Sequence, residues 1–196
     1  MSRGGRPALP PSIPQHPFSW RQRVCGTFLR WCGWRVSGEI PDVARLVLIA
    51  APHSSWWDGF WGLLAKVALG IDLAFMGKRE LFRGPLGWLL RRLGGIPVER
   101  IATHGVVEQM VARFRTSPRL WLGLAPEGTR KAVTEWRSGF WHIAREAEVP
   151  ILPIVFDYPS KTIRFGPLFQ PTPDKAVDLA ALRAFYRPFR GRHRGA

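Results

Sequence analysis

The chain has 196 residues, of which 29 are Lys or Arg and 14 are Asp or Glu, giving a formal net charge of +15 at pH 7. Its 46% hydrophobic content is that of one globular domain with a core, and its two cysteines argue against a disulfide framework and fit a reduced, cytosolic setting. No apolar run reaches the ~18 residues of a membrane-spanning helix, so the charge points to nucleic acid, an anionic membrane surface or phosphorylated small molecules as partners.

The N-terminal part of the chain divides into two segments. Residues 1–17 are rich in proline and arginine and lack an apolar secretory region, which predicts a disordered leader. Residues 18–36 repeat aromatic and apolar side chains at helical spacing between arginines, as in an amphipathic helix that lies in a membrane interface. A helix that docks on the rest of the protein is the alternative. The residues expected to contact lipid are Trp20, Phe28, Trp31 and Trp34.

Apolar strand-like runs alternate with helical patterns through residues 37–190, which we expect to form the main domain. Strands are expected at 44–50, 72–77, 96–98, 120–124, 151–156 and 162–165, and helices at 54–69, 85–93, 104–115, 139–148 and 174–185. This alternation predicts an α/β fold with a mixed, largely parallel sheet flanked by helices and preceded by the N-terminal amphipathic helix. Residues 191–196 form a basic tail. Ligands of such sheets bind beyond the carboxyl ends of the strands.

His53 and Asp58 lie at the first junction between a strand and a helix, in Ala51-Pro52-His53-Ser54-Ser55-Trp56-Trp57-Asp58. Ser54 or Ser55 is a suitable N-cap. If His53 lies just outside the helix, its ring can fold back onto the first turn and reach the carboxylate of Asp58. Asp58 would then fix the tautomer, so that the other ring nitrogen acts as a base. A structural histidine with no catalytic role is the alternative.

Two further polar segments follow predicted strands. The run Gly94-Gly95-Ile96-Pro97-Val98-Glu99-Arg100 is the first, and Pro126-Glu127-Gly128-Thr129-Arg130 is the second. Gly128 allows close backbone approach to a ligand, and the planar fork of Arg130 suits phosphate or carboxylate. Thr129 can donate a hydrogen bond, while Glu127 would hold Arg130 or a substrate hydroxyl. Taken alone, the second segment is more typical of a turn that ends a strand and carries a surface ion pair.

The three motifs, in this order, resemble the signature blocks of the glycerolipid acyltransferases, the 1-acylglycerol-3-phosphate acyltransferase family. The resemblance implies acyl transfer from acyl-CoA or acyl-carrier protein to a hydroxyl of a lysophospholipid-like acceptor, with His53 as base and no acyl-enzyme. It implies neither metal nor cofactor, and a peripheral position on the cytoplasmic face of the membrane. The residues that it assigns to the acceptor are Glu127, Gly128, Thr129, Arg130, Arg100 and Lys78.

Two departures from the family pattern leave the identity of the acceptor open. Relatives often have Phe where this chain has Ala125, and Asp where it has Glu99. A basic membrane-surface or nucleic-acid binding module without catalysis is the alternative function, favoured by the +15 charge and the arginine-rich C-terminal region. Because the sequence contains no recognisable nucleic-acid motif, we do not expect nucleic acid as a partner.

Overall fold

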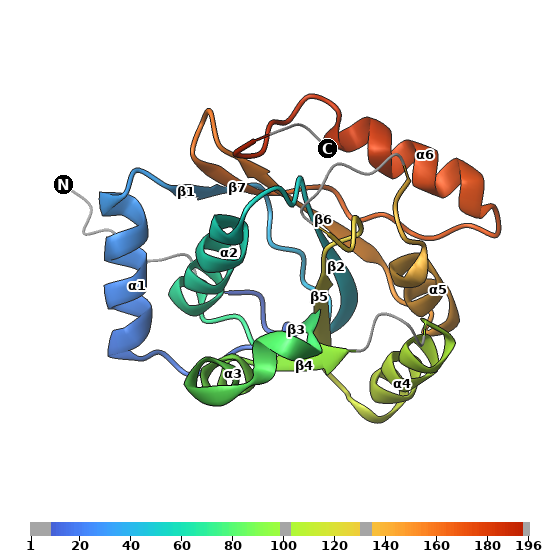
Figure 1. The fold of residues 1–196 in the computed structure, drawn as a ribbon, viewed down its shortest axis with the longest axis horizontal. Helices are drawn as coiled ribbons and strands as arrows, with labels where there is room; N and C mark the ends of the chain where they lie inside the picture. The colour runs from blue at the N-terminus through green and yellow to red at the C-terminus, as the bar shows by residue number, and fades with distance from the viewer. Residues whose placement is uncertain (1–8, 99–102, 130–134, 194–196) are drawn as a thin grey trace.

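The computed structural model describes residues 9–98, 103–129 and 135–193 of the chain (Figure 1). In these residues seven strands form one sheet, in the order β1 (Arg35–Ser37), β7 (Thr162–Phe165), β6 (Ile151–Asp157), β2 (Arg45–Ala51), β5 (Leu120–Leu124), β3 (Leu73–Lys78) and β4 (Gly95–Val98). Neighbouring strands are parallel except β6 and β7, which pair antiparallel. The predicted α/β fold with a mixed, largely parallel sheet is confirmed.

Helices cover both faces of the sheet. They are α1 (Trp20–Trp31), α2 (Trp56–Leu69), α3 (Gly84–Arg92), α4 (Thr103–Thr116), α5 (Gly139–Glu146) and α6 (Lys175–Tyr186), with a short 3-10 helix, η1 (Arg79–Phe82), between β3 and α3. Alternate residues of β2 point to opposite faces. Val47 and Ile49 pack in the cluster that contains α4, α5 and α6, whereas Leu46 and Leu48 pack in the cluster that contains α1 and α2. The central strand is therefore buried on both sides, as parallel strands usually are.

The N-terminal helix is shorter than predicted, because it ends at Trp31 and not near residue 36. Gly33 adopts φ +82°, and the amides of Gly33 and Trp34 donate to the carbonyls of Arg30 and Leu29, a glycine-terminated helix end that reverses the chain. Trp34 is consequently 3% exposed and stacks on Trp61 with ring centroids 5.0 Å apart. The prediction that Trp34 contacts lipid is wrong.

Residues 9–17, which precede α1, are ordered and pack against the domain. Ile13 is fully buried, Gln15 forms an antiparallel bridge with Ile71, and the carbonyl of Pro14 accepts a hydrogen bond from the Asp72 amide at 2.8 Å. The predicted disordered leader is wrong for residues 9–17, because Ile13 contributes to the core and proline carbonyls can still accept bonds from a neighbouring segment. Residues 1–8 lie outside the described residues. Within the described part of the chain, no helix is long and apolar enough to span a membrane.

Candidate active site

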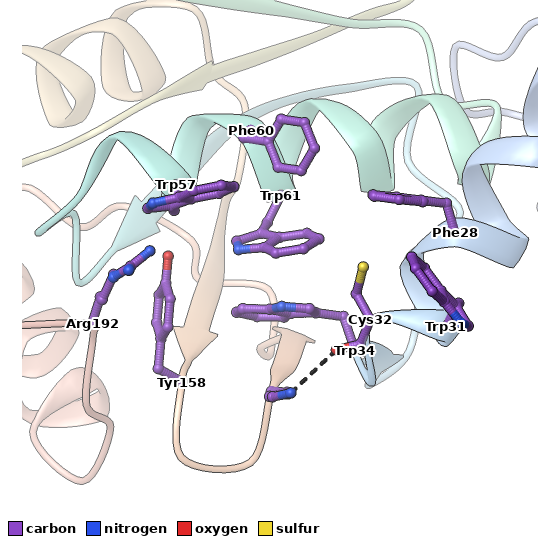
Figure 2. A pocket seen from close by; sticks show the side chains of 10 residues that line it. Phe28, Trp31, Cys32, Trp34, Trp57, Phe60, Trp61, Tyr158 and Arg192 are labelled. Carbon is purple, nitrogen blue, oxygen red and sulfur yellow. Dashed lines mark hydrogen bonds between the residues drawn. The ribbon is translucent and has the colours of Figure 1, made fainter.

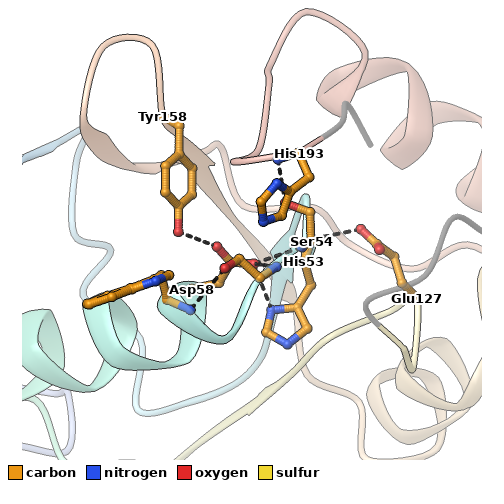
Figure 3. A network of polar contacts seen from close by, with 8 residues as sticks. His53, Ser54, Asp58, Glu127, Tyr158 and His193 are labelled. Carbon is orange, nitrogen blue, oxygen red and sulfur yellow. Dashed lines mark hydrogen bonds and ion pairs between the residues drawn. The ribbon is translucent and has the colours of Figure 1, made fainter.

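The candidate site lies at the carboxyl end of β2, where the chain passes through residues 52–55 into α2. The strands beside β2 are β5 and β6, both parallel to it. Their carboxyl ends therefore lie at the same edge of the sheet as His53. The chain leaves β5 into the Glu127 turn and leaves β6 into Tyr158, so that three segments far apart in sequence meet at one edge (Figures 1 and 3).

Asp58 is the most enclosed polar residue of the site, with 1% of its surface exposed. It is the third residue of α2, and its Oδ2 accepts hydrogen bonds from the backbone amides of Ser54 and Ser55, both at 2.7 Å. Ser55 is the N-cap, since its Oγ accepts a bond from the Trp57 amide at 3.2 Å. Amide donors and the positive end of the helix both stabilise a carboxylate in this position.

The imidazole of His53 lies against this carboxylate, with Nδ1 3.5 Å from Asp58 Oδ2. The ring is 26% exposed and the Asp58 side chain is fully enclosed. The backbone places His53 before the N-cap, outside the helix, which is the geometry that the sequence required for the two side chains to meet. A distance of 3.5 Å is at the long limit of a hydrogen bond, and catalytic bonds commonly shorten only when substrate binds.

Tyr158 reaches the same carboxylate from β6, and sequence reasoning missed it. Its hydroxyl donates to Asp58 Oδ1 at 2.5 Å, and its ring packs edge-on against Trp34. Burial, followed by the bond to Asp58, raises the pKa of Tyr158 above its ordinary value, so the hydroxyl remains a donor at neutral pH. One sequence signal for it existed, because Tyr158 follows an apolar strand as His53 and Glu127 do.

Glu127 links the second polar segment to the first. It is buried, and its Oε1 accepts a hydrogen bond from the backbone amide of His53 at 2.8 Å. The sequence predicted that Glu127 holds Arg130 or a substrate hydroxyl, and the bond to the His53 backbone was not anticipated. Gly128 has φ +63°, a conformation that glycine adopts without strain, and Thr129 is partly buried beside it.

Three more residues were assigned to the acceptor, namely Lys78, Arg100 and Arg130. Lys78 ends β3, which is separated from β2 by β5, and its ammonium is exposed and lies 3.1 Å from Glu80. Arg100 and Arg130 lie outside the described residues, as does Glu99. Among the residues that the structure describes, no group of three or more His, Cys, Asp or Glu side chains has the arrangement of a metal site.

Two further predictions concern the N-terminal helix and the C-terminal residues. Trp20, Phe28 and Trp31 of α1 are exposed, as a contact with lipid would require. The predicted basic tail begins close to Asp58: the amide of His193 donates to Ser54 Oγ at 3.3 Å, and the Tyr158 amide donates to the Arg190 carbonyl at 3.0 Å.

Comparisons with known proteins agree on one family. A model of the acyltransferase family, described as "Acyltransferase", matches residues 35–157. The 1-acyl-sn-glycerol-3-phosphate acyltransferase of Streptococcus pneumoniae is 26% identical over 136 residues, which cover 64% of this chain and 50% of the relative. Human lysophosphatidylcholine acyltransferase 2 is 28% identical over 74% of this chain and 29% of its own. The Escherichia coli 1-acyl-sn-glycerol-3-phosphate acyltransferase is 31% identical over 47% of this chain and 40% of its own.

The same fold occurs in a solved structure. The crystal structure of the 1-acyl-sn-glycerophosphate acyltransferase from Thermotoga maritima superposes with a TM-score of 0.60, over 84% of this chain and 74% of that one, at 18% identity. The chain spans half or less of the length of the curated relatives described above.

Proposed function

Because the chain belongs to the acyltransferase family, we propose that it transfers a fatty acyl group from a thioester, acyl-CoA or acyl-carrier protein, to a hydroxyl of a lysophospholipid-like acceptor. The observation that carries the proposal is the His53–Asp58 pair at the end of the central strand, with Asp58 held by two amides and a tyrosine hydroxyl. The relatives named above act on acceptors of this class, which supports the choice of substrate.

In the proposed reaction, His53 is the general base and Asp58 orients it. With Nδ1 directed at Asp58, the Nε2 nitrogen takes the proton of the acceptor hydroxyl as its oxygen attacks the thioester carbonyl. The new C–O bond forms, the C–S bond breaks, and the proton passes from His53 to the leaving thiolate. Proton transfer of this kind contributes about 10²- to 10⁴-fold in rate. No acyl-enzyme and no metal take part.

The acceptor is proposed to bind on the Glu127 side of His53. The turn at Glu127, Gly128 and Thr129 begins beside the His53 backbone, and Arg130 follows it directly in the sequence. Arg130 and Arg100 are proposed to share an anionic group of the acceptor, since a guanidinium binds two oxygens of a phosphate at once. Lys78 adds positive charge at the same edge of the sheet.

The enzyme is proposed to work as a peripheral protein on the cytoplasmic face of an anionic membrane. Exposed Trp20, Phe28 and Trp31 share α1 with the exposed arginines Arg21, Arg23 and Arg30. Each basic residue near anionic lipid contributes about 1 kcal/mol, and the indole rings suit the interface between lipid and water. Trp34, being buried, has no part in this contact.

The test is acyl transfer to lysophosphatidate in anionic vesicles, with palmitoyl-CoA and palmitoyl-acyl-carrier protein in parallel and the product lipid quantified by mass spectrometry. We expect product from at least one donor, and a loss of at least about 10²-fold for His53→Ala. His16→Ala is the matched control, because His16 also lies beside an aspartate but far from the site in a surface ion pair. Near-normal transfer by His53→Ala would overturn the proposal, as would salt-dependent DNA binding without transfer by the wild-type chain.

A further inference from the structure

A cavity of about 390 Å³ lies between the turn after β6 and the C-terminal residues 190–193. Its wall contains two arginines and a histidine, which we call the C-terminal cluster: Arg190, Arg192 and His193. The other residues that line the cavity are Tyr158, Pro159 and Gly191, so that none of the described lining residues is acidic. The volume falls within the range of about 300–1,000 Å³ that is usual for small-molecule sites. The cavity therefore suits a small molecule that carries negative charge.

The backbone of the C-terminal segment is held at both ends of the cluster. The carbonyl of Arg190 accepts a hydrogen bond from the Tyr158 amide at 3.0 Å, and the Arg190 amide donates to Asp157 Oδ1 at 3.4 Å. Three residues later, the amide of His193 donates to Ser54 Oγ at 3.3 Å. A ligand would thus meet side chains that project from an ordered backbone, which lowers the entropy cost of binding.

The two guanidinium groups of the cluster are exposed and carry uncompensated charge. Within the described part of the chain, neither Arg190 nor Arg192 forms an ion pair with a carboxylate. The carboxylate of Asp157 accepts the Arg190 amide with one oxygen and the Ser160 hydroxyl with the other. The Arg192 guanidinium lies over the Trp57 ring, 5.3 Å from its centroid (Figure 2). This contact orients the cation without neutralising it.

The cavity borders the His53–Asp58 pair on a different side from Glu127. Tyr158 belongs to the cavity wall and donates its hydroxyl to Asp58. Figure 3 shows Tyr158 and His193 above the pair, whereas Glu127 lies to its right. Because the anionic group of the acceptor is proposed to bind on the Glu127 side, the C-terminal cluster is a second cationic region beside the same reacting groups.

We propose that the C-terminal cluster binds a phosphate group of a substrate. A phosphate ester presents several charged oxygens, and each guanidinium can bind two of them at once. The identity of the substrate rests on the proposed function. Both the pantetheine carrier of the donor and the head group of the acceptor contain phosphate, and the separation of the cluster from Glu127 favours the carrier.

Calorimetry with two phosphate-bearing probes tests the proposal without turnover. CoA has the phosphates of the carrier and no acyl chain, and 1-hexanoyl-lysophosphatidate is an acceptor that dissolves without a bilayer. Each probe is titrated into the wild-type chain, Arg190→Ala, Arg192→Ala and the control Arg187→Ala. Arg187 is an exposed arginine at the end of α6 that does not line the cavity. The control therefore loses the same charge from the same end of the chain, and urea denaturation checks that every variant is folded.

We expect Arg190→Ala and Arg192→Ala each to weaken CoA binding about 10- to 100-fold, the effect of losing a charge-assisted hydrogen bond. Binding of hexanoyl-lysophosphatidate should be unchanged, and Arg187→Ala should change either affinity by less than about twofold, since salt screens a distant charge. A loss confined to hexanoyl-lysophosphatidate would also support a phosphate site and would assign it to the acceptor. Equal effects of all three substitutions would overturn the proposal, as would a wild-type chain that binds neither probe.

Two further results separate this proposal from its neighbours. Binding that depends on Arg190 and Arg192 in a chain without transferase activity would refute the proposed function alone, whereas an active chain whose affinities ignore both arginines would refute this proposal alone. Co-sedimentation with phosphatidylglycerol vesicles is measured on the same variants. If Arg190→Ala and Arg192→Ala reduced only this co-sedimentation, the cluster would contact the bilayer surface, and the proposal of a substrate site would be wrong.

Discussion

Two histidine–aspartate pairs lie at opposite ends of α2, and their surroundings differ more than their distances. His53 Nδ1 lies 3.5 Å from Asp58 before the helix starts, and His16 Nε2 lies 3.3 Å from Asp72 after it ends. The second pair is the shorter, yet its side chains are 58% and 53% exposed, against 26% and 0% for the first. Asp58 accepts two amides and a tyrosine hydroxyl as well. The distance alone therefore does not distinguish the His53–Asp58 pair from the His16–Asp72 pair, whereas burial and the fixed donors to Asp58 do.

The largest expected difference concerns the two aspartates. Asp58→Ala leaves two amides and the Tyr158 hydroxyl without their acceptor, and each lost partner in a buried place costs about 1–3 kcal/mol. We expect Asp58→Ala to lower the free energy of unfolding by about 3 kcal/mol or more, and Asp72→Ala by less than about 1 kcal/mol. Urea denaturation of both variants measures this. Similar losses would show that the two pairs are energetically equivalent.

A smaller effect is expected from the residue that holds the His53 backbone. Glu127→Ala removes a charge-assisted bond, which is worth about 1.5–3 kcal/mol, and lets the histidine drift relative to Asp58. Transfer should fall about 10- to 100-fold, mainly in kcat. Glu108→Ala is the control, since Glu108 is an exposed carboxylate of α4 that belongs to none of the proposed sites. If the two glutamate variants have the same kcat, the Glu127 bond plays no part in placing His53.

The Tyr158 hydroxyl contributes less, because Asp58 keeps its two amide donors without it. Tyr158→Phe should cost about 1 kcal/mol of stability. It should also move the low-pH limb of the pH–rate profile to higher pH, since a less stabilised carboxylate attracts a proton on His53 more strongly. A purely structural tyrosine would leave that limb in place.

The pH dependence of stability follows from the raised pKa of Tyr158. Below about pH 10 the hydroxyl is protonated in both folded and unfolded chains, so the stability difference between wild type and Tyr158→Phe should be constant. Above that pH the unfolded chain ionises first, and the advantage of the wild type should shrink. If chemical denaturation showed that the stability difference between wild type and Tyr158→Phe grows as the pH rises, the hydrogen bond from Tyr158 to Asp58 would be contradicted.

We expect the smallest change in stability for the exposed His16–Asp72 pair. His16→Ala should change the free energy of unfolding by about 0–1 kcal/mol at pH 5.5, and 1 M NaCl should remove the change. Transfer activity should not respond. Salt-resistant stabilisation by His16 would mean that this pair is more than a surface contact.

Contacts between residues close in sequence could be predicted, whereas contacts between distant segments could not. The alternation of strands and helices is local, and it predicted the sheet, with β1 missed because Gly33 ends the helix before Trp34. The meeting of His53 and Asp58 spans only five residues, and capping rules were enough to predict it. The bonds from Glu127 and Tyr158 bridge 74 and 100 residues, and they depend on β5 and β6 being the neighbours of β2. That order of strands is a property of the whole chain, and no local pattern contains it.

The bonds from Ser54 and Ser55 to Asp58 come from the main chain, and this bears on which substitutions the site can tolerate. At position 54 any amino acid with a backbone N–H can donate the bond, and only proline lacks one. Every replacement at position 54 except proline should therefore keep this bond, while the burial of Ser54 limits the position to small side chains, and position 58 should admit hardly any replacement. Two of the donors to the Asp58 carboxylate are backbone amides, and their position depends on the backbone conformation. A comparison of residue types between sequences therefore does not detect them.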